Sequence, residues 1–269
     1  MAELDVRAYG ARIGVADMAL PPTLATLRTL LAAHMRAIPF ENLDVLLHRP
    51  IRLDLASLQD KLIGACRGGY CFEHASLFAA VLEALGFELA RHTARVVLIQ
   101  PLSQSPRTHM FMTVRLPEGV FVADPGFGGP ASILPVPLVD AGPQAPPGAS
   151  HCMQREGARW TLRARGGAGP VAAWTSTLEV ENPVDFEMGS HFVATHPTSP
   201  FLQRLMLGRF TPAGRVGVMN RTASIARGDA TETIDLPDRA ALRRFAADHL
   251  ALDLPEFATL RVPAVPEWD

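Results

Sequence analysis

The sequence has few cysteines, and this scarcity excludes several classes of protein. Three cysteines occur among 269 residues, with no Cys-x-x-Cys pair, so we expect no disulfide framework. Cys66 lies near Cys71, but this pair lacks the further ligands of a zinc site, and we interpret Cys66 and Cys152 as structural. The N-terminal segment Met1-Ala-Glu-Leu-Asp5 is acidic and does not resemble a signal peptide. Together these features predict a cytoplasmic protein.

Charge of one sign and long hydrophobic runs are also lacking. Charged residues make up 19% of the chain and the formal net charge is −2, which argues against nucleic-acid binding and against a polybasic membrane anchor. The apolar runs are far too short to span a membrane. Because 48% of the residues are apolar, the chain can bury a large core. We therefore expect a soluble protein that acts on a small molecule, with its oligomeric state left open.

Nucleotide-binding and metal-binding signatures are missing as well. The stretch Gly126-Phe-Gly-Gly129 has neither GxGxxG spacing nor a Walker lysine, although its backbone is suited to lie against a ligand. His191 and His196 lie near Asn182 and Asp185 in the sequence, but histidines in such a setting more often face solvent or bond to the backbone. We predict no metal site.

The most informative stretch that is present is Arg67-Gly-Gly-Tyr-Cys-Phe-Glu73. Apolar residues after Cys71 recur at helical spacing until Gly86, so the cysteine lies in or just before the first turn of a helix. Unpaired N–H groups and the positive end of the helix dipole favour a thiolate there, and Gly68-Gly69 allows close approach of the backbone. A buried structural cysteine is the alternative interpretation.

The hydrophobic period changes twice along the chain and predicts an α+β fold. Residues 1–86 show helical spacing, with Pro39 interrupting a helix before Glu41. Residues 87–190 change to strand patterns, with a hairpin turn at Pro117-Glu-Gly119. Residues 191–269 show helical spacing in some segments and strand patterns in others. The strands and helices expected in these last two parts are strands at 91–99, 110–116, 120–123, 160–164, 173–180, 215–219 and 232–236, a helical patch at 199–207, and a helix from the N-cap Asp238 to about Leu250.

A nucleophilic cysteine needs a base, and the base needs an acceptor that orients it. His109 begins the second strand and Asp124 ends the third, so the hairpin brings both to one end of the sheet. A turn centred near Glu118 places Asp124 opposite Met112, and direct contact with His109 then requires a bulge or a different turn. A backbone-bonded histidine and a turn-forming aspartate are the alternatives. The order Cys, His, Asp is that of papain-like and transglutaminase-like enzymes.

Several motifs, in this order, resemble those of the arylamine N-acetyltransferases. They are Ile38-Pro-Phe-Glu-Asn-Leu43, Arg67-Gly-Gly-Tyr-Cys-Phe-Glu73, Thr108-His109, Val122-Ala-Asp-Pro-Gly-Phe-Gly-Gly129 and Thr195-His-Pro-Thr-Ser-Pro-Phe201. The resemblance implies three domains: a helical bundle (1–86) that carries the nucleophile, a β-barrel (87–190) that carries the histidine and aspartate, and an α/β lid (191–269). It also implies a cysteine-protease-like catalytic triad of Cys71, His109 and Asp124.

The resemblance further implies a reaction and its ligands. The reaction is ping-pong acetyl transfer from acetyl-CoA, a co-substrate, to an arylamine, arylhydrazine or arylhydroxylamine through an acetyl-Cys71 thioester, with no permanently bound cofactor. A supporting salt bridge joins Glu41 and Arg67. The implied contacts with the pantetheine arm of CoA are Val97, Thr108, Gly126, Phe127, Gly128 and Gly129, and those with the aromatic acceptor are Phe40, Phe127 and Phe201.

Two positions depart from the family pattern, and other functions stay open. Pro125 stands where an apolar residue such as valine is usual, and His74 where leucine is common. A macrolactam-forming amide synthase would use the same chemistry on another acyl chain. A papain-like or transglutaminase-like thiol hydrolase would use the same triad on peptide amides, and a binding protein would keep the scaffold without catalysis.

Overall fold

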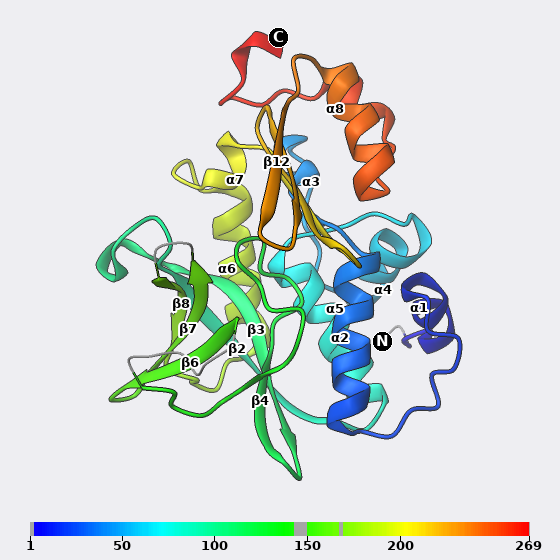
Figure 1. Cartoon of the computed structure of the whole chain (residues 1–269). Coiled ribbons are helices and arrows are strands. Elements are labelled where there is room, and N and C mark those ends of the chain that lie inside the picture. Colours follow the sequence, from blue (N-terminus) through cyan, green and yellow to red (C-terminus); the bar gives the residue numbers. More distant parts are fainter. Residues whose placement is uncertain (1–2, 143–149, 167–168, 269) are drawn as a thin grey trace.

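The computed structural model describes residues 3–142, 150–166 and 169–268, and its N-terminal part is helical (Figure 1). Side chains of Asp5, Thr23 and Asp54 accept hydrogen bonds from the first turns of three helices, as N-caps do. The helices of this part are α1 (Val6–Ile13), α2 (Leu24–Ala37), α3 (Leu43–Leu46), α4 (Leu55–Leu58), its π-helical continuation η1 (Gln59–Gly64) and α5 (Cys71–Ala84).

A seven-stranded antiparallel sheet follows and curls into a nearly closed β-barrel (Figure 1). The strand order is β5-β4-β3-β2-β8-β7-β6, and the two edge strands β5 and β6 contact each other. The α+β fold class is thereby confirmed. The strands are β2 (Glu88–Val96), β3 (Arg107–Leu116), β4 (Gly119–Ala123), β5 (Val136–Pro137), β6 (His151–Glu156), β7 (Arg159–Gly166) and β8 (Gly169–Ser176), with a 3-10 turn η2 (Leu102–Gln104) before β3.

The C-terminal part contains a second sheet, and one strand of that sheet comes from the N-terminal part. The two-residue strand β1 (Phe40–Glu41) pairs with β9, giving the order β1-β9-β10-β11-β12. The remaining elements are α6 (Pro183–Thr195), α7 (Pro200–Gln203), β9 (Met206–Thr211), β10 (Gly214–Met219), β11 (Thr222–Arg227), β12 (Ala230–Asp235), α8 (Arg239–Phe245), η3 (Ala246–Leu250), η4 (Pro255–Thr259) and η5 (Pro266–Trp268).

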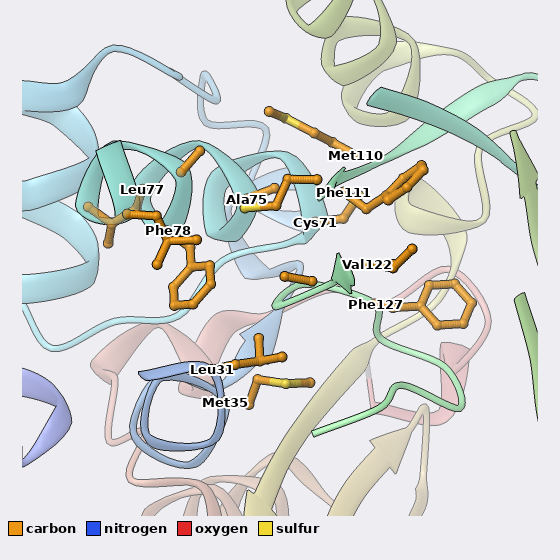
Figure 2. Close-up of a cluster of buried hydrophobic side chains, with 14 of the residues drawn as sticks. Leu31, Met35, Cys71, Ala75, Leu77, Phe78, Met110, Phe111, Val122 and Phe127 are labelled. Carbon is orange, nitrogen blue, oxygen red and sulfur yellow. The ribbon is translucent and has the colours of Figure 1, made fainter. Parts of the chain in front are cut away.

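Two hydrophobic cores hold these layers together. The larger core joins the helices to the barrel, and Figure 2 shows part of it, with α2 and α5 facing strand residues such as Phe111 and Val122. The smaller core lies between the second sheet and the C-terminal helices, and it also includes Leu43 and Leu46 of α3. Because α3 contributes to this smaller core, the N-terminal helical part and the C-terminal part are packed together.

The structure confirms several predicted elements and corrects others. The helix beginning at Cys71, the turn at residues 117–118 and the N-cap Asp238 are as predicted. The helical patch at 199–207 is wrong beyond residue 203, because β9 begins at Met206. The predicted boundary between residues 190 and 191 falls inside α6 (Pro183–Thr195), a helix that the periodicity did not predict. No helix in the described ranges is both long and apolar enough to cross a membrane.

Candidate active site

Cys71 is the first residue of α5, where the sequence predicts it. Cys71 is 4% exposed, and Figure 2 shows it at the end of that helix beside Phe111. The backbone N–H of Tyr70 donates to Glu73 Oε2 at 3.1 Å, so Glu73 holds the chain at the point where the helix begins. Gly126 lies directly against Cys71, because a Cβ there would lie 2.7 Å from Cys71 Cα. The thiol is therefore placed between the helix start and the glycine loop.

His109 and Asp124 lie within hydrogen-bond distance of each other, with Nε2 of His109 2.8 Å from Asp124 Oδ2. The predicted register is wrong by one residue, because Met112 pairs with Ala123 rather than with Asp124. Asp124 therefore comes directly after the last residue pair of the ladder between β3 and β4, which is Met112 with Ala123. His109 and Asp124 are diagonal neighbours, a separation that an imidazole and a carboxylate can span.

A β-bulge precedes His109. In the ladder between β2 and β3, Ala94 pairs with His109 but Arg95 pairs with Arg107, so Thr108 is the extra residue. Such a bulge re-aims the neighbouring side chain and frees the carbonyl of the extra residue. The Thr108 carbonyl oxygen lies 3.6 Å from Cys71 Sγ and accepts the thiol hydrogen bond. The bulge thus brings both the imidazole and a carbonyl to the cysteine.

His109 is protonated over a wide pH range. Burial by itself lowers the pKa of this imidazole, but the charge and hydrogen bond of Asp124, followed by the interactions with Cys71, outweigh burial and raise the pKa to about 10. Asp124 is 4% exposed, so its charge is poorly screened by solvent. Nε2 of His109 faces Asp124, and the other ring nitrogen is left for the cysteine.

Trp174 is a site residue that the sequence analysis missed. Its indole Nε1 donates to Asp124 Oδ2 at 2.9 Å, the same oxygen that His109 contacts. The other oxygen, Asp124 Oδ1, is buried and has no hydrogen-bond partner among the described residues. A tryptophan within a strand pattern carries no local signal of this contact, since β8 and the Asp124 loop are 50 residues apart.

A buried charge network lies behind the cysteine. The predicted salt bridge is present, with Arg67 2.6 Å from Glu41, and Arg67 also contacts Asp44 at 3.1 Å. Lys61 bridges Asp44 and Glu73, each at 2.7 Å. Three carboxylates thus face two cations, and burial raises the pKa of Glu73 to about 7 although Lys61 opposes this shift.

His74, one of the departures noted above, belongs to a buried hydrogen-bonded chain. Its Nε2 lies 3.2 Å from the Pro39 carbonyl, and its Nδ1 lies 2.8 Å from Nε2 of His34, whose Nδ1 lies 3.0 Å from the Tyr9 hydroxyl. A carbonyl oxygen only accepts, so with neutral rings His74 donates to Pro39, His34 donates to His74, and the Tyr9 hydroxyl donates to His34. Burial lowers the pKa of His74 to about 4, although the hydrogen bond to Pro39 opposes that shift, so both rings are neutral near pH 7.

A cavity of about 1170 Å³ opens onto Cys71 and His109. It is large enough for a sizeable co-substrate together with a small acceptor. Val97 does not line it, whereas its neighbours Val96 and Leu98 do. The other predicted ligand contacts all line the cavity: Phe40, Thr108, Gly126, Phe127, Gly128, Gly129 and Phe201.

The glycine loop is fixed from the second sheet. The guanidinium of Arg215, on β10, donates to the carbonyl oxygens of both Gly128 and Gly129. The rings of Phe40 and Phe201 lie edge to face across the cavity, with centroids 6.2 Å apart. Residues from all three parts of the chain therefore form the walls.

Cys66, Cys152 and His196 lie outside the group formed by Cys71, His109 and Asp124, although the partners of His196, Thr198 and Phe192, line the cavity. Cys66 is exposed and Cys152 is buried, and neither is in a disulfide. His196 bonds to Thr198, and its ring stacks on Phe192 at 4.2 Å. Within residues 3–142, 150–166 and 169–268, no group of three or more His, Cys, Asp and Glu side chains is suited to hold a metal ion.

Comparison with known proteins gives consistent matches over most of the chain. A family model described as N-acetyltransferase matches residues 23–258. The arylamine N-acetyltransferase of Mycolicibacterium smegmatis is 37% identical over 97% of this chain and 96% of that protein. The arylamine N-acetyltransferase / N-hydroxyarylamine O-acetyltransferase of Salmonella typhimurium is 35% identical over 92% and 88%. The structure of the Mycobacterium marinum arylamine N-acetyltransferase in complex with CoA superposes with a TM-score of 0.87, at 33% identity, covering 94% of each chain.

Proposed function

The chain belongs to the arylamine N-acetyltransferase family, and from this we propose that it acetylates arylamines, arylhydrazines or arylhydroxylamines with acetyl-CoA, through an acetyl-Cys71 thioester. The observation that carries the proposal is the placement of Cys71 and His109 at one cavity, with Asp124 within hydrogen-bond distance of His109. Cys71 is assigned as the nucleophile, His109 as the acid and base, and Asp124 as the group that orients His109.

In the first half-reaction the Cys71 thiolate attacks the thioester carbonyl of acetyl-CoA. The new S–C bond forms, the bond to the CoA sulfur breaks, and the proton held by His109 passes to the departing CoA thiolate. The raised pKa of His109 keeps that proton available at neutral pH. Backbone N–H groups at the start of α5 are suited to stabilise the tetrahedral oxyanion, because the first turn of a helix has unpaired donors.

In the second half-reaction the amine attacks the acetyl-Cys71 carbonyl. After the first half-reaction His109 is neutral, so its free ring nitrogen accepts the proton that the amine loses. The N–C bond forms and Cys71 leaves as a thiolate beside the newly charged imidazolium. Asp124 keeps Nε2 of His109 engaged, which leaves the opposite nitrogen facing the sulfur throughout the cycle.

The cavity suggests where the two substrates bind. We assign the pantetheine arm of CoA to the glycine loop and its neighbours, with Val96 in place of Val97, because only the former lines the cavity. The set is then Val96, Thr108, Gly126, Phe127, Gly128 and Gly129. The acceptor ring is assigned to the aromatic walls formed by Phe40, Phe127 and Phe201, since aromatic rings pair favourably edge to face.

The three-domain division is also proposed, with a changed border. The first unit (1–86) carries Cys71 and the second carries His109 and Asp124. The second border, predicted at residue 190, is moved to the end of α6, because one continuous helix belongs to one unit and α6 packs against β3. The mixed C-terminal part then forms the α/β lid over the cavity. The cytoplasmic location stays a prediction from the cysteine content.

Intact-protein mass spectrometry tests the proposed cycle. We expect a gain of one acetyl group after mixing with acetyl-CoA and its loss when an arylamine such as 5-aminosalicylate is added. Cys71→Ala should gain no acetyl group. Cys66→Ala is the matched control and should be acetylated like the protein without a substitution. If the protein gains none while Cys71 still alkylates, another acyl donor is used and the amide-synthase function is favoured. Cleavage of a fluorogenic peptide would favour a thiol hydrolase.

A further inference from the structure

Trp174 and His109 reach the same carboxylate oxygen from opposite sides of the central strand β2. Ala94 of β2 pairs with His109 on β3, and Val96 of β2 pairs with Trp174 on β8. Residues 94 and 96 lie on one face of β2, so the two partner side chains also lie on one face. Strands β3 and β8 are about 10 Å apart at two strand spacings. The small side chain of Ala94 leaves room between them, and the two rings lean together to a centroid distance of 6.1 Å.

Each of the two rings lies next to a β-bulge. Thr108 is the extra residue before His109, as described above. In the ladder between β7 and β8, Leu162 pairs with Trp174 but Arg163 pairs with Ala172, so Ala173 is an extra residue directly before Trp174. A bulge changes the direction of the neighbouring side chain. Two separate irregularities of the barrel therefore direct an imidazole and an indole toward Asp124.

The hydrogen bonds at Asp124 distinguish Trp174 from an ordinary core residue. The indole of Trp174 is fully buried, and its N–H donates to Asp124 Oδ2 at 2.9 Å, beside the 2.8 Å contact from His109. Asp124 Oδ1 has no partner in the described part of the chain. The indole is thus the second donor to the carboxylate, and because an indole N–H has no acceptor form it donates whatever the protonation of His109.

We propose that Trp174 is a positioning residue of the catalytic pair: its indole N–H fixes the Asp124 carboxylate so that Oδ2 faces Nε2 of His109. The proposal rests on the proposed function for the roles of Asp124 and His109. Without the indole N–H, a buried carboxylate with one remaining donor is free to turn about its side-chain bonds, and the imidazole loses its fixed orientation toward Cys71. The loss of a donor to the anion also makes the His109–Asp124 pair bind protons more readily.

The first test compares Trp174→Phe with Trp160→Phe, a matched change on the neighbouring strand β7. The rate of acetyl-Cys71 formation should fall by about ten- to hundredfold in Trp174→Phe and stay unchanged in Trp160→Phe. The acid limb of the pH profile for alkylation of Cys71 by iodoacetamide should move to higher pH in Trp174→Phe alone. An unmoved profile would overturn the proposal, since an imidazolium that has lost its fixed orientation stabilises the Cys71 thiolate less.

Two further variants separate the N–H from the ring. Replacing Trp174 by benzothienylalanine keeps the bicyclic shape and removes only the N–H, and we expect the same loss of rate as in Trp174→Phe. In an Asp124→Asn background, Trp174→Phe should lower the rate of acetyl-Cys71 formation little further, because Trp174 acts through the Asp124 carboxylate. Full activity of the benzothienyl protein, or additive losses in the double variant, would show that Trp174 only fills space.

Alkylation of Cys71 needs no acetyl-CoA, so its pH profile reports on Trp174 even if the protein uses another acyl donor. A protein that shows the expected shift of the profile but no acetyl-Cys71 would retain this inference and lose the proposed function. The converse result, acetylation with an unmoved profile, would retain the function and reject the role of Trp174.

Discussion

The carbonyl oxygen of Thr108 lies 3.6 Å from the sulfur of Cys71 and accepts the hydrogen bond of its thiol. A thiolate has no proton to donate to a carbonyl, so the sulfur has two alternative partners: Thr108 when protonated and His109 when ionised. The bulge at Thr108 supplies both partners, because it frees the carbonyl and re-aims the histidine. Loss of the thiol proton therefore exchanges the Thr108 carbonyl for His109 as the partner of the sulfur.

The first prediction concerns the reactivity of Cys71 at mildly acidic pH. Because His109 retains its proton up to a pKa of about 10, the Cys71 sulfur faces a positively charged imidazolium near pH 6. Iodoacetamide should therefore modify Cys71 at least about tenfold faster than Cys66 at pH 6, although Cys66 is the exposed thiol. Peptide mass spectrometry of the quenched reaction measures both rates in one sample. Faster labelling of Cys66, or an unchanged ratio in His109→Gln, would contradict this effect of His109.

The second prediction concerns His74 and acid stability. Its folded-state pKa, about 4, lies below the ordinary histidine value of about 6.5. The unfolded chain therefore binds more protons between these values, and the histidine stabilises the fold above pH 6.5 but loses that contribution as pH falls toward 4. Relative to His74→Leu, the unfolding free energy of the unmodified protein should fall by about 3 kcal/mol between pH 7 and pH 4. Urea titrations at several pH values measure this difference.

The unfolding free energies of the two proteins, plotted against pH, should also differ by a constant amount. His74→Leu leaves the buried Nε2–H of His34 without its acceptor, which costs about 1–3 kcal/mol at every pH. Glu73, whose raised pKa of about 7 gives the opposite slope, is present in both proteins and cancels in the difference. If the unfolding free energies of the unsubstituted protein and of His74→Leu changed equally with pH, His74 would not be held neutral by burial.

The third prediction concerns the buried ion pair behind the active site. Replacing Arg67 by Met leaves Glu41, 1% exposed, without its cation and should lower the unfolding free energy by about 3–5 kcal/mol. Arg115→Met is the matched control, because the Arg115–Glu88 pair is 66% and 72% exposed and should leave the urea midpoint nearly unchanged. Equal effects of the two substitutions would argue against a buried network.

The fourth prediction concerns the glycine loop against the nucleophile. A Cβ at Gly126 would lie 2.7 Å from Cys71 Cα and 2.9 Å from Cys71 O, and backbone atoms cannot give way cheaply. Gly126→Ala should slow acetyl-Cys71 formation by about a hundredfold, because displacement of a reacting group by about 1 Å has that effect. Gly64→Ala, where the nearest atom is 3.8 Å away, is the control and should keep its rate in the same burst assay.

The nucleophile and its helix could be predicted from the sequence because their signals are local. Glycines, an acidic residue and helical spacing around Cys71 specify the start of α5 within a few residues. The placement of His109 and Asp124 at one end of a hairpin followed from the turn at Pro117, and only the one-residue register and the bulge at Thr108 had no local signal.

Contacts between distant segments could not be predicted in this way. His74 was noted as an unusual titratable group, but its partner His34 is 40 residues away on another helix. Trp174 reaches Asp124 through a bulge that one strand's pattern does not show. The strand β1 has only two residues and pairs with β9 far along the chain, so its period is too short to detect.

The pairing of β1 with β9 has a consequence for the order in which the molecule can be completed. Asn42, directly after β1, donates to the carbonyls of Phe201 and Arg204 and accepts from the N–H of Met206, 164 residues later. During synthesis Cys71, His109 and Asp124 all leave the ribosome before these partners exist. The wall formed by Phe201 and Arg215 is therefore among the last parts to assemble, and contacts of such long sequence separation form slowly. A nascent chain therefore contains its thiol before residues 201–215 have been made, and the enclosed cavity that confines substrates arises only after them.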